Sequence, residues 1–366
     1  MAKKRATTGD SPTLTSLRRQ IDKLDKQLLD LLNTRAKLVV EVGKVKREAE
    51  KLAYDPHREQ KILDKLKSAN KGPLGEAVIQ SVFREVISGC RALAAPSRIA
   101  YLGPEFSYSH QAAIQRFGQS ATLVPVGTIA AVFDEVISAE ADFGLVPMEN
   151  STDGRIADTL TMFARTPARI CGEVQLRIHH NLLGLCDRPA VTDVYSKPQA
   201  LSQCRDWLAK HLPQAQLHET ASTTAAAEVA AKTKGAAAVA GKLAGQHYGL
   251  NIIAPNIEDN PNNVTRFAVI GNQAYPRTKN DKTAIMFQVE HKPGALADAM
   301  NLFKRNRLNL TWIESFPIPE QPSEYLCFVE LEGHETDTRV KRAIEALEKK
   351  CLRLEVLGSY QKTEIV

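Results

Sequence analysis

A chain of 366 residues is too long for one ordinary hydrophobic core and indicates two or three domains. A composition of 43% hydrophobic and 25% charged residues is typical of soluble globular proteins, and no stretch has the apolar length of a membrane span. The net charge of +6 is spread along the chain without the aromatic-interleaved basic clusters of nucleic-acid readers, so small anionic ligands are favoured over nucleic acid or membrane.

The N-terminus and the cysteines predict little structure of their own. The N-terminal segment 1–13 has no apolar stretch before a cleavage site, and we expect a disordered tail on a cytoplasmic protein. The six cysteines lie far apart, with no CxxC or Cys/His ligand spacing. These features predict reduced thiols, no metal and no cofactor.

Residues 14–95 are predicted to form an all-α domain. A helix from about residue 15 to residue 51 would be about 55 Å long, more than a small domain covers, so we expect a second copy of the chain to pack on it. Arg35 occupies one position of its apolar seam, where an unpaired guanidinium is costly to bury. Arg35 is therefore either an interhelical salt-bridge partner or a ligand of a bound anion, and Lys46 returns to nearly the same face. The apolar seam, with its coiled-coil-like spacings of four and three, consists of Leu17, Ile21, Leu24, Leu28, Leu31, Leu38, Val42 and Val45.

The segment LRRQIDKLDKQLLDLLNTRAKLVVEVGKVK, followed by YDPHRE, resembles the all-helical chorismate mutases of the intertwined-dimer type. That family carries a Glu or Gln where Ala94 stands and a small hydroxyl residue where Cys90 stands, so a domain that only dimerises is the alternative. The resemblance implies that chorismate is held by Arg18 of the partner subunit, Arg35, Lys46 and Arg58, with Asp55 and Glu59 around its ring hydroxyl.

Residues 98–272 alternate short apolar runs with helical stretches, which predicts an α/β domain with a parallel sheet. Several strands end in polar residues directly before a helix, where free N–H groups and hydroxyls bind carboxylates. Each of these ends alone is an ordinary N-cap, but together they predict a site for a small acid. They are 103–109, 149–151, 195–199 and 222–224.

The stretch NIEDNPNNVTRF, residues 256–267, is predicted to be a loop that enters a strand. Because strand side chains alternate between faces, Thr265 and Phe267 should share one face while Arg266 points to the other or bends to a rim. A plain strand start with an exposed arginine is the alternative.

Together with NIEDNPNNVTRF, the segments YLGPEFSYSHQAA, GLVPMENSTDGRI and VYSKPQALSQC resemble prephenate dehydratase, whose two-lobed fold is similar to periplasmic binding proteins. The resemblance implies that Thr265 assists the departing hydroxyl of prephenate, with Glu149 as the rival proton donor if burial raises its pKa. Phe106 and Lys197 depart from the family pattern, and Phe106 would be strained if its turn needs a positive φ. The other implied site residues are Glu149, Asn150, Ser151, Ser196, Gln203, Arg266 and Phe267.

Residues 281–366 follow the order strand, helix, strand, strand, helix, strand, which predicts an α+β ferredoxin-like module. The segments HKPGALADAMNLF and NLTWIESFP resemble the ACT regulatory domain of phenylalanine-pathway enzymes. This implies phenylalanine bound at Gly294, Ala295 and Leu296, with Glu314 and Ser315 closing the site across a dimer interface. Relatives carry Arg in place of Phe316. A purely structural module is the alternative.

The three resemblances together indicate a bifunctional chorismate mutase and prephenate dehydratase of phenylalanine biosynthesis, regulated by phenylalanine and assembled as a homodimer or homotetramer. A monofunctional dehydratase and a non-catalytic sensor of small acids are the alternatives. The Thr265-Arg266-Phe267 motif opposite residues 149–151 favours an enzyme, because a sensor needs carboxylate clamps but no hydroxyl at a leaving group.

Overall fold

The computed structural model describes residues 13–49, 55–152, 154–318 and 321–365, without the side chains of 321–323. The chain divides into two compact units, one ending at Pro96 and the other beginning at Ser97. The predicted tail lies almost wholly outside the described residues. No helix among those described is long and apolar enough to cross a membrane.

The first unit consists of helices that the sequence predicts. Thr13 caps the first helix by accepting a hydrogen bond from the Ser16 N–H, and Asp55 caps the second through the Arg58 N–H. The first helix has 35 residues, which makes it about 53 Å long. The helices are α1 (Leu14–Glu48), α2 (Pro56–Ala69) and α3 (Glu76–Ala94).

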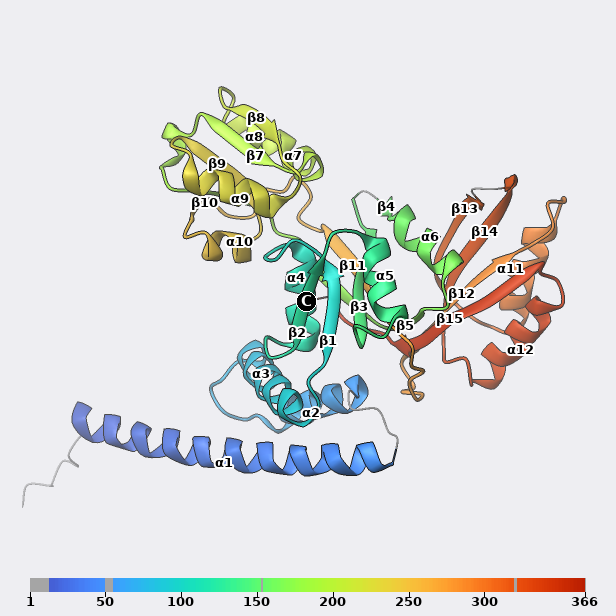
Figure 1. Cartoon of the computed structure of the whole chain (residues 1–366), viewed down its shortest axis with the longest axis horizontal. Coiled ribbons are helices and arrows are strands. Elements are labelled where there is room, and N and C mark those ends of the chain that lie inside the picture. The colour runs from blue at the N-terminus through green and yellow to red at the C-terminus, as the bar shows by residue number, and fades with distance from the viewer. Residues whose placement is uncertain (1–12, 50–54, 153, 319–320, 366) are drawn as a thin grey trace, which may run out of the picture. The chain divides into compact units, whose positions relative to one another are not determined.

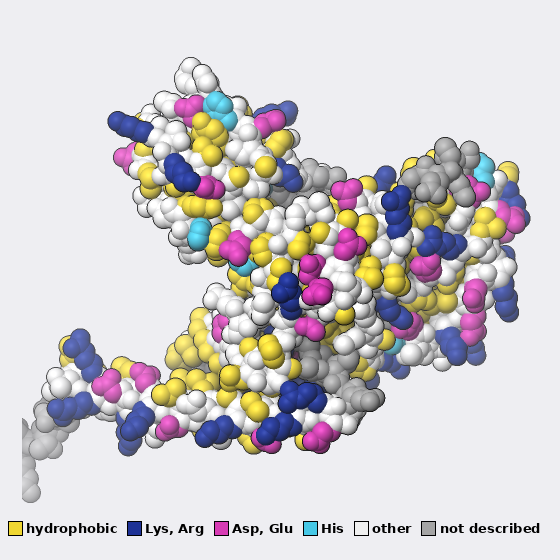
Figure 2. Space-filling view, viewed as in Figure 1, with side chains coloured by type: hydrophobic (Ala, Val, Ile, Leu, Met, Phe, Trp, Pro, Cys, Tyr) yellow, Lys and Arg dark blue, Asp and Glu magenta, His cyan; other side chains and the backbone are white. Residues whose placement is uncertain are grey.

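The apolar seam of α1 is exposed in the single chain. Leu31 is 68% exposed and Leu24 62% exposed, and α1 buries none of its residues. Figure 2 shows apolar side chains reaching the surface along this helix between charged ones. Apolar side chains on a long helix normally face a partner, so this seam is an incomplete interface.

The second unit begins with a mixed sheet, which we call the first lobe, in the order β2-β1-β3-β11-β5, with β4 beside β3. The prediction of a parallel sheet is right for β1, β2 and β3 but wrong at β11, which is antiparallel to both β3 and β5. The reason is connectivity, since the chain leaves this sheet after β5 and re-enters it at β11 from the far side. The elements are β1 (Arg98–Leu102), α4 (Tyr108–Phe117), β2 (Thr122–Val126), α5 (Ile129–Ile137), β3 (Phe143–Asn150), β4 (Gly154–Arg155), α6 (Ala157–Arg165), β5 (Arg169–Arg177) and β11 (Val264–Gly271).

Between β5 and β11 the chain builds the second lobe, a sheet in the order β10-β6-β9-β7-β8 with helices around it (Figure 1). The helix predicted over residues 199–212 is two helices that meet at Cys204. Residues 178–180 and 255–263 connect the lobes. The elements are β6 (Asn181–Gly184), a 3-10 turn (Arg188–Ala190), β7 (Asp193–Ser196), α7 (Pro198–Gln203), α8 (Arg205–His211), β8 (Gln216–Glu219), α9 (Thr223–Lys232), β9 (Ala236–Ala240), α10 (Lys242–His247) and β10 (Asn251–Ala254).

The remaining strands form the C-terminal sheet, in the order β13-β14-β12-β15. The predicted βαββαβ order is present, and this strand order is that of a ferredoxin-like fold. Helices α11 and α12 cover one face of this sheet, where Phe303 of α11 and Phe287 of β12 belong to the same core. On the other face, Met286 and Phe328 share a core with the first lobe. The elements are β12 (Asp281–Gln288), α11 (Ala295–Arg305), β13 (Leu310–Ile318), β14 (Gln321–Glu332), α12 (Thr338–Glu348) and β15 (Arg353–Gln361).

Strand β15 approaches the backbone of β5 closely at Gly358. This glycine has a φ of 147°, and a Cβ built on it would lie 2.2 Å from the carbonyl oxygen of Ile170. Only glycine fits between the two strands, so the contact between the C-terminal sheet and the first lobe depends on it.

We expect Gly358→Ala to lower the free energy of unfolding of the second unit by more than the roughly 1–3 kcal/mol of backbone strain alone, because Ile170 has to move. Urea unfolding of the full chain measures this. Gly249→Ala is the matched control, since Gly249 has a φ of 67° but nothing within 4 Å of its added Cβ. An equal loss in both variants would contradict the close-contact argument.

Candidate functional site

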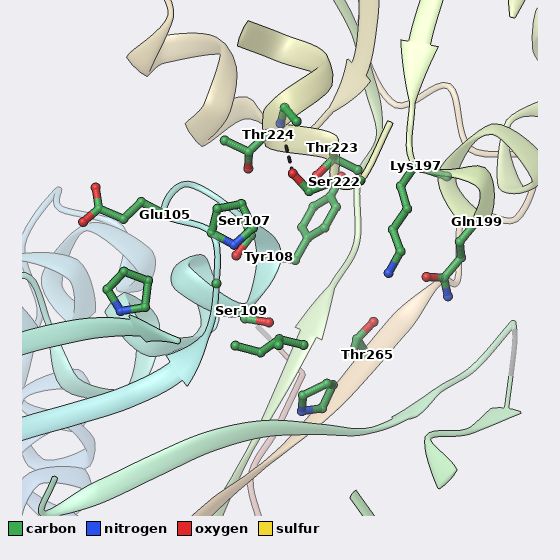
Figure 3. A pocket seen from close by; sticks show the side chains of 18 of the residues that line it. Glu105, Ser107, Tyr108, Ser109, Lys197, Gln199, Ser222, Thr223, Thr224 and Thr265 are labelled. Carbon is green, nitrogen blue, oxygen red and sulfur yellow. Dashed lines mark hydrogen bonds between the residues drawn. The ribbon is translucent and has the colours of Figure 1, made fainter. Parts of the chain in front are cut away.

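A cavity of about 800 Å³ lies between the two lobes. Strand ends and loops of the first lobe form one wall, and the starts of α7 and α9 form the other (Figure 3). Its size suits a small organic ligand. Its polar lining consists of Glu105, Ser107, Tyr108, Ser109, Asn150, His180, Lys197, Gln199, Gln203, Ser222, Thr223, Thr224, Glu228 and Thr265.

Thr265 lies in this lining at the start of β11, opposite Asn150 of β3. The Asn150 Oδ1 accepts the Thr152 N–H at 2.9 Å, which fixes the orientation of the amide. Its Nδ2 therefore donates to Thr265 Oγ1 at 2.8 Å and to Asn263 Oδ1 at 3.0 Å. Because Thr265 accepts from Asn150, its own hydroxyl proton is directed elsewhere and can be donated to a ligand in the cavity.

A chain of hydrogen bonds continues from Asn263 to the second lobe. Asn263 Nδ2 donates to Gln203 Oε1 at 2.9 Å, and His180 Nε2 lies 2.8 Å from the same oxygen. Because that oxygen already accepts from Asn263, His180 carries a proton on Nε2. The Tyr108 hydroxyl lies 2.8 Å from His180 Nδ1, and burial raises the pKa of Tyr108 well above its usual value. This network joins the lobes at the floor of the cavity.

Both walls of the cavity have features that favour anions. Helices α4 and α9 direct their N-termini at the cavity, and Ser222 caps α9 by accepting the Ala225 N–H at 3.0 Å. Thr224 is only 4% exposed, and its hydroxyl has no hydrogen-bond partner among the described residues. Lys197 is the only Lys or Arg in the described lining, and Figure 3 shows it reaching into the cavity toward Thr265. A buried hydroxyl without a partner and a cation in the same cavity are both suited to carboxylates.

Phe106 adopts the positive φ that the sequence predicts to be strained, at 62°. Two contacts of Phe106 compensate for the strain of this backbone conformation. Its N–H donates to His110 Nδ1 at 2.8 Å, and its ring stacks on His247 of the second lobe at 3.7 Å between centroids. The strained turn thereby packs one lobe on the other beside the cavity-lining residues Glu105 and Ser107.

Asn150, Gln203, Thr265 and Phe267 line the cavity, as predicted for site residues, but the other four predicted residues do not. The Ser196 hydroxyl is fully buried and donates to the Val239 carbonyl at 2.6 Å. Ser151 bonds the loop at residues 262–264. These positions correct the prediction that both residues contact the ligand, because each hydroxyl already bonds the protein backbone.

Arg266 and Glu149 also lie outside the cavity lining. Strand alternation turns Arg266 toward the C-terminal sheet, where its Nε donates to Glu149 at 3.2 Å and its Nη1 to Glu330. Of the two orientations predicted for Arg266, the one opposite Thr265 is therefore correct, and its predicted contact with the ligand is not supported. Glu149, with its carboxylate on Arg266, is not placed to donate a proton in the cavity.

In the first unit, the predicted residues occupy different environments. Nη1 of Arg35 is buried without a hydrogen-bond partner among the described residues, and Lys46 is half-buried. Arg18 and Arg58 are exposed, and Asp55 caps α2. Glu59 forms an ion pair with Arg91 at 2.5 Å, a partner that could not be predicted because Arg91 lies on another helix, 32 residues further along the chain. Ala94 packs against Gly43, with 3.0 Å between its Cβ and a Cβ built on the glycine.

The predicted effector residues lie at the start of α11 and on β13, the edge strand of the C-terminal sheet. Gly294 is left-handed with a φ of 84° and begins α11, and Ala295 and Leu296 are partly or fully exposed there. On β13, Ser315 is exposed and Glu314 bonds Arg155 of the first lobe at 3.0 Å. Phe316 faces the opposite way, into the core shared with the first lobe.

Comparisons with known proteins agree with this division. Residues 17–95 match the family model "Chorismate mutase type II", and residues 99–275 match "Prephenate dehydratase". Bifunctional chorismate mutase/prephenate dehydratases of Aquifex aeolicus and Stutzerimonas stutzeri are 42% and 41% identical, covering 95% and 97% of this chain and 98% and 99% of theirs. A prephenate dehydratase from Arthrobacter aurescens, solved with L-Phe, is 31% identical with a TM-score of 0.68, covering 72% of this chain and 90% of its own. The described residues contain no cluster of His, Cys, Asp or Glu that could hold a metal ion.

We expect Asn150→Ala to lower the free energy of unfolding of the second unit by about 1–3 kcal/mol, because it leaves buried Asn263 without its donor. Urea unfolding provides the measurement. Asn262→Ala, an exposed change in the same loop, is the control and should alter stability by less than about 0.5 kcal/mol. A neutral Asn150→Ala would show that the hydrogen-bond chain does not order the site.

Proposed function

The chain belongs to the family of bifunctional chorismate mutases/prephenate dehydratases, and from that premise we propose how its own residues carry out the two reactions. One reaction converts chorismate to prephenate by a Claisen rearrangement. The other converts prephenate to phenylpyruvate with loss of water and CO2. Both belong to phenylalanine biosynthesis.

In the dehydratase site, Thr265 donates its proton to the hydroxyl that leaves prephenate. The ring carboxylate departs as CO2, the electrons of its C–C bond complete the aromatic ring, and the ring C–O bond breaks, so that the oxygen takes up one proton and leaves as water. Aromatisation drives this step, and a hydrogen-bonded hydroxyl therefore suffices where a saturated alcohol would need a stronger acid. The observation that supports this role is the Asn150 bond, which occupies the acceptor side of Thr265 and leaves its proton for the ligand.

The two carboxylates of prephenate are bound on the opposite wall. We assign one carboxylate to the N-terminus of α9 and the unpartnered Thr224 hydroxyl, and the other to Lys197, with Gln199 beside it. Phe267 supplies an apolar surface for the ring, since it lines the cavity on the same face as Thr265. Holding both anions fixes the ring so that its hydroxyl meets Thr265.

The mutase reaction needs no acid or base, only a chair-like conformer and cations facing the oxygen that gains negative charge. Arg35 supports this role because its buried Nη1 has no partner among the described residues, a costly arrangement unless an anion binds there. We place Lys46 and Arg58 with it, and Asp55 and Glu59 near the ring hydroxyl, as the resemblance implies.

A second copy of the chain completes this site by covering the exposed seam of α1. A helix about 53 Å long with apolar residues exposed along its length needs a partner of equal length, and another α1 provides one. Arg18 of the partner subunit would then reach the site. The homodimer follows from this incomplete interface.

Residues 281–366 are proposed to act as an ACT regulatory domain that binds phenylalanine, with residues 98–272 as the dehydratase domain. The Arthrobacter aurescens relative was solved with L-Phe, which supports phenylalanine as the effector. The start of α11 at Gly294, Ala295 and Leu296 is accessible to an amino acid, with Glu314 and Ser315 on the neighbouring strand.

Thr265→Ala is expected to reduce kcat for phenylpyruvate formation by at least about 100-fold, because the proton donor is lost while the carboxylate contacts stay. Steady-state kinetics on prephenate, with binding measured by calorimetry, separate the two effects. Thr265→Ser keeps the hydroxyl and should retain most of the activity. A large loss of prephenate binding in Thr265→Ala would reassign Thr265 to substrate binding.

Arg35→Ala is expected to lower kcat/KM for chorismate by about 10²–10³-fold through loss of a cation at the transition state, with dehydration of prephenate unchanged. Separate assays with chorismate and with prephenate test this, and Arg19→Ala, an exposed change on the same helix, is the control. Equal loss of both activities would indicate collapse of the dimer. A wild-type chain that turns over prephenate alone would be a monofunctional dehydratase.

A further inference from the structure

Arg266 is the centre of a buried cluster of charges between the first lobe and the C-terminal sheet. Its Nη1 donates to Glu330 and lies 3.7 Å from Glu173, and Lys282 Nζ donates to Glu173 at 3.0 Å. Glu173 and Glu330 are 2% and 1% exposed, and the two cations are 8% and 6% exposed. Two cations thus balance the two buried carboxylates, the condition under which buried charge is tolerated, and the partly exposed Glu149 also bonds Arg266.

The C-terminal sheet contributes one residue from each of its four strands to this cluster. Glu330 comes from β14 and Lys282 from β12, while the Tyr360 hydroxyl of β15 donates to Glu330 at 2.6 Å. The Trp312 ring of β13 lies against the guanidinium, 4.9 Å from its centre. Trp312 is paired with Glu330 in the sheet, and Lys282 with Tyr360. Because Glu330 is itself paired with Ala284, two residues from Lys282, the contacts lie in two neighbouring rows of the sheet.

Arg266 is also the sequence neighbour of Thr265, whose hydroxyl is proposed to react. Arg266 follows Thr265 in β11, and the register of β11 against β3 shifts between Arg266 and Phe267. The bulge interrupts the ladder of hydrogen bonds on the β3 side, while the pairing of β11 with β5 stays regular from Val264 to Val269. On the interrupted side, side-chain contacts have a larger share in fixing the position of the strand. On one face of this irregular site Thr265 bonds Asn150, and on the other Arg266 bonds Glu330.

From this geometry we propose that Arg266 is a positioning residue, which holds Thr265 at its reactive place by anchoring β11 to Glu330 of the C-terminal sheet. The proposal rests on the dehydratase function proposed above. It assigns the C-terminal sheet a part in catalysis itself, in addition to any effector that it binds. It also explains why a cation within a motif that resembles a dehydratase site points away from the cavity.

Kinetics on prephenate with the full-length chain test the proposal. Glu330→Gln keeps the shape of the side chain but weakens its bond to Arg266, and Arg266→Met removes the cation. Each is expected to lower kcat by about 10- to 100-fold with KM within about threefold, as for a displaced catalytic group. Arg266→Lys should restore part of kcat. The double variant should lose little more than the worse single variant, because the two residues act as one unit.

Arg169→Met is the matched control. Arg169 forms another ion pair between the first lobe and the C-terminal region, with Glu335 at 3.0 Å, but at the far end of β11 from Thr265. Its kcat should stay within about threefold of the wild type. An equal fall in Arg169→Met would mean that any loosening of the sheet impairs the enzyme, and the proposal would be wrong.

Three further outcomes are decisive. Wild-type kcat in Glu330→Gln would overturn the proposal, and this near-isosteric variant decides the matter if Arg266→Met fails to fold. A raised KM with unchanged kcat in Arg266→Met would make Arg266 a substrate ligand instead. A wild-type chain that does not dehydrate prephenate would refute the proposed function, which is a separate failure from that of the positioning role.

Discussion

The alternation of side chains along β11 is the constraint on which the dehydratase site depends. Thr265 and Phe267 face the cavity, and Arg266 between them faces the C-terminal sheet. A one-residue slip of this strand would place a guanidinium in the cavity and a hydroxyl among buried carboxylates. The ion cluster therefore fixes the register of the strand as well as its position, because the slipped arrangement leaves Lys282 as the one cation of the cluster against two buried carboxylates, Glu173 and Glu330.

The site also requires the two lobes to be held together, and polar groups do this at its floor. The chain from Thr265 through Asn150, Asn263 and Gln203 to His180 uses amides whose orientation is fixed by neighbours. Such a network is stable only when every member is satisfied, so a change in one member affects the others. The stacking of Phe106 on His247 adds a ring contact between the same lobes. The two lobes are thus held together both by directional hydrogen bonds and by aromatic stacking.

Much of this could be predicted from the sequence. Apolar runs and turn residues located the strands, and alternation gave the two possible directions of Arg266. The strand directions could not be predicted, because β11 pairs with β3 and β5 only after the chain has built a second sheet in between. The carboxylate partners of Arg266 lie far from it in the chain, at Glu149, Glu173 and Glu330, and no local pattern marks them.

The two active sites differ in what a single chain can supply. The lining of the dehydratase cavity and the ion cluster beside it are both built from residues of the second unit. In the helical unit, by contrast, Arg35 has a buried nitrogen without a partner among the described residues, on a helix whose apolar seam is exposed. In the dimer that we propose, association of two chains supplies the energy that completes the mutase site. That dimer makes the mutase activity depend on protein concentration.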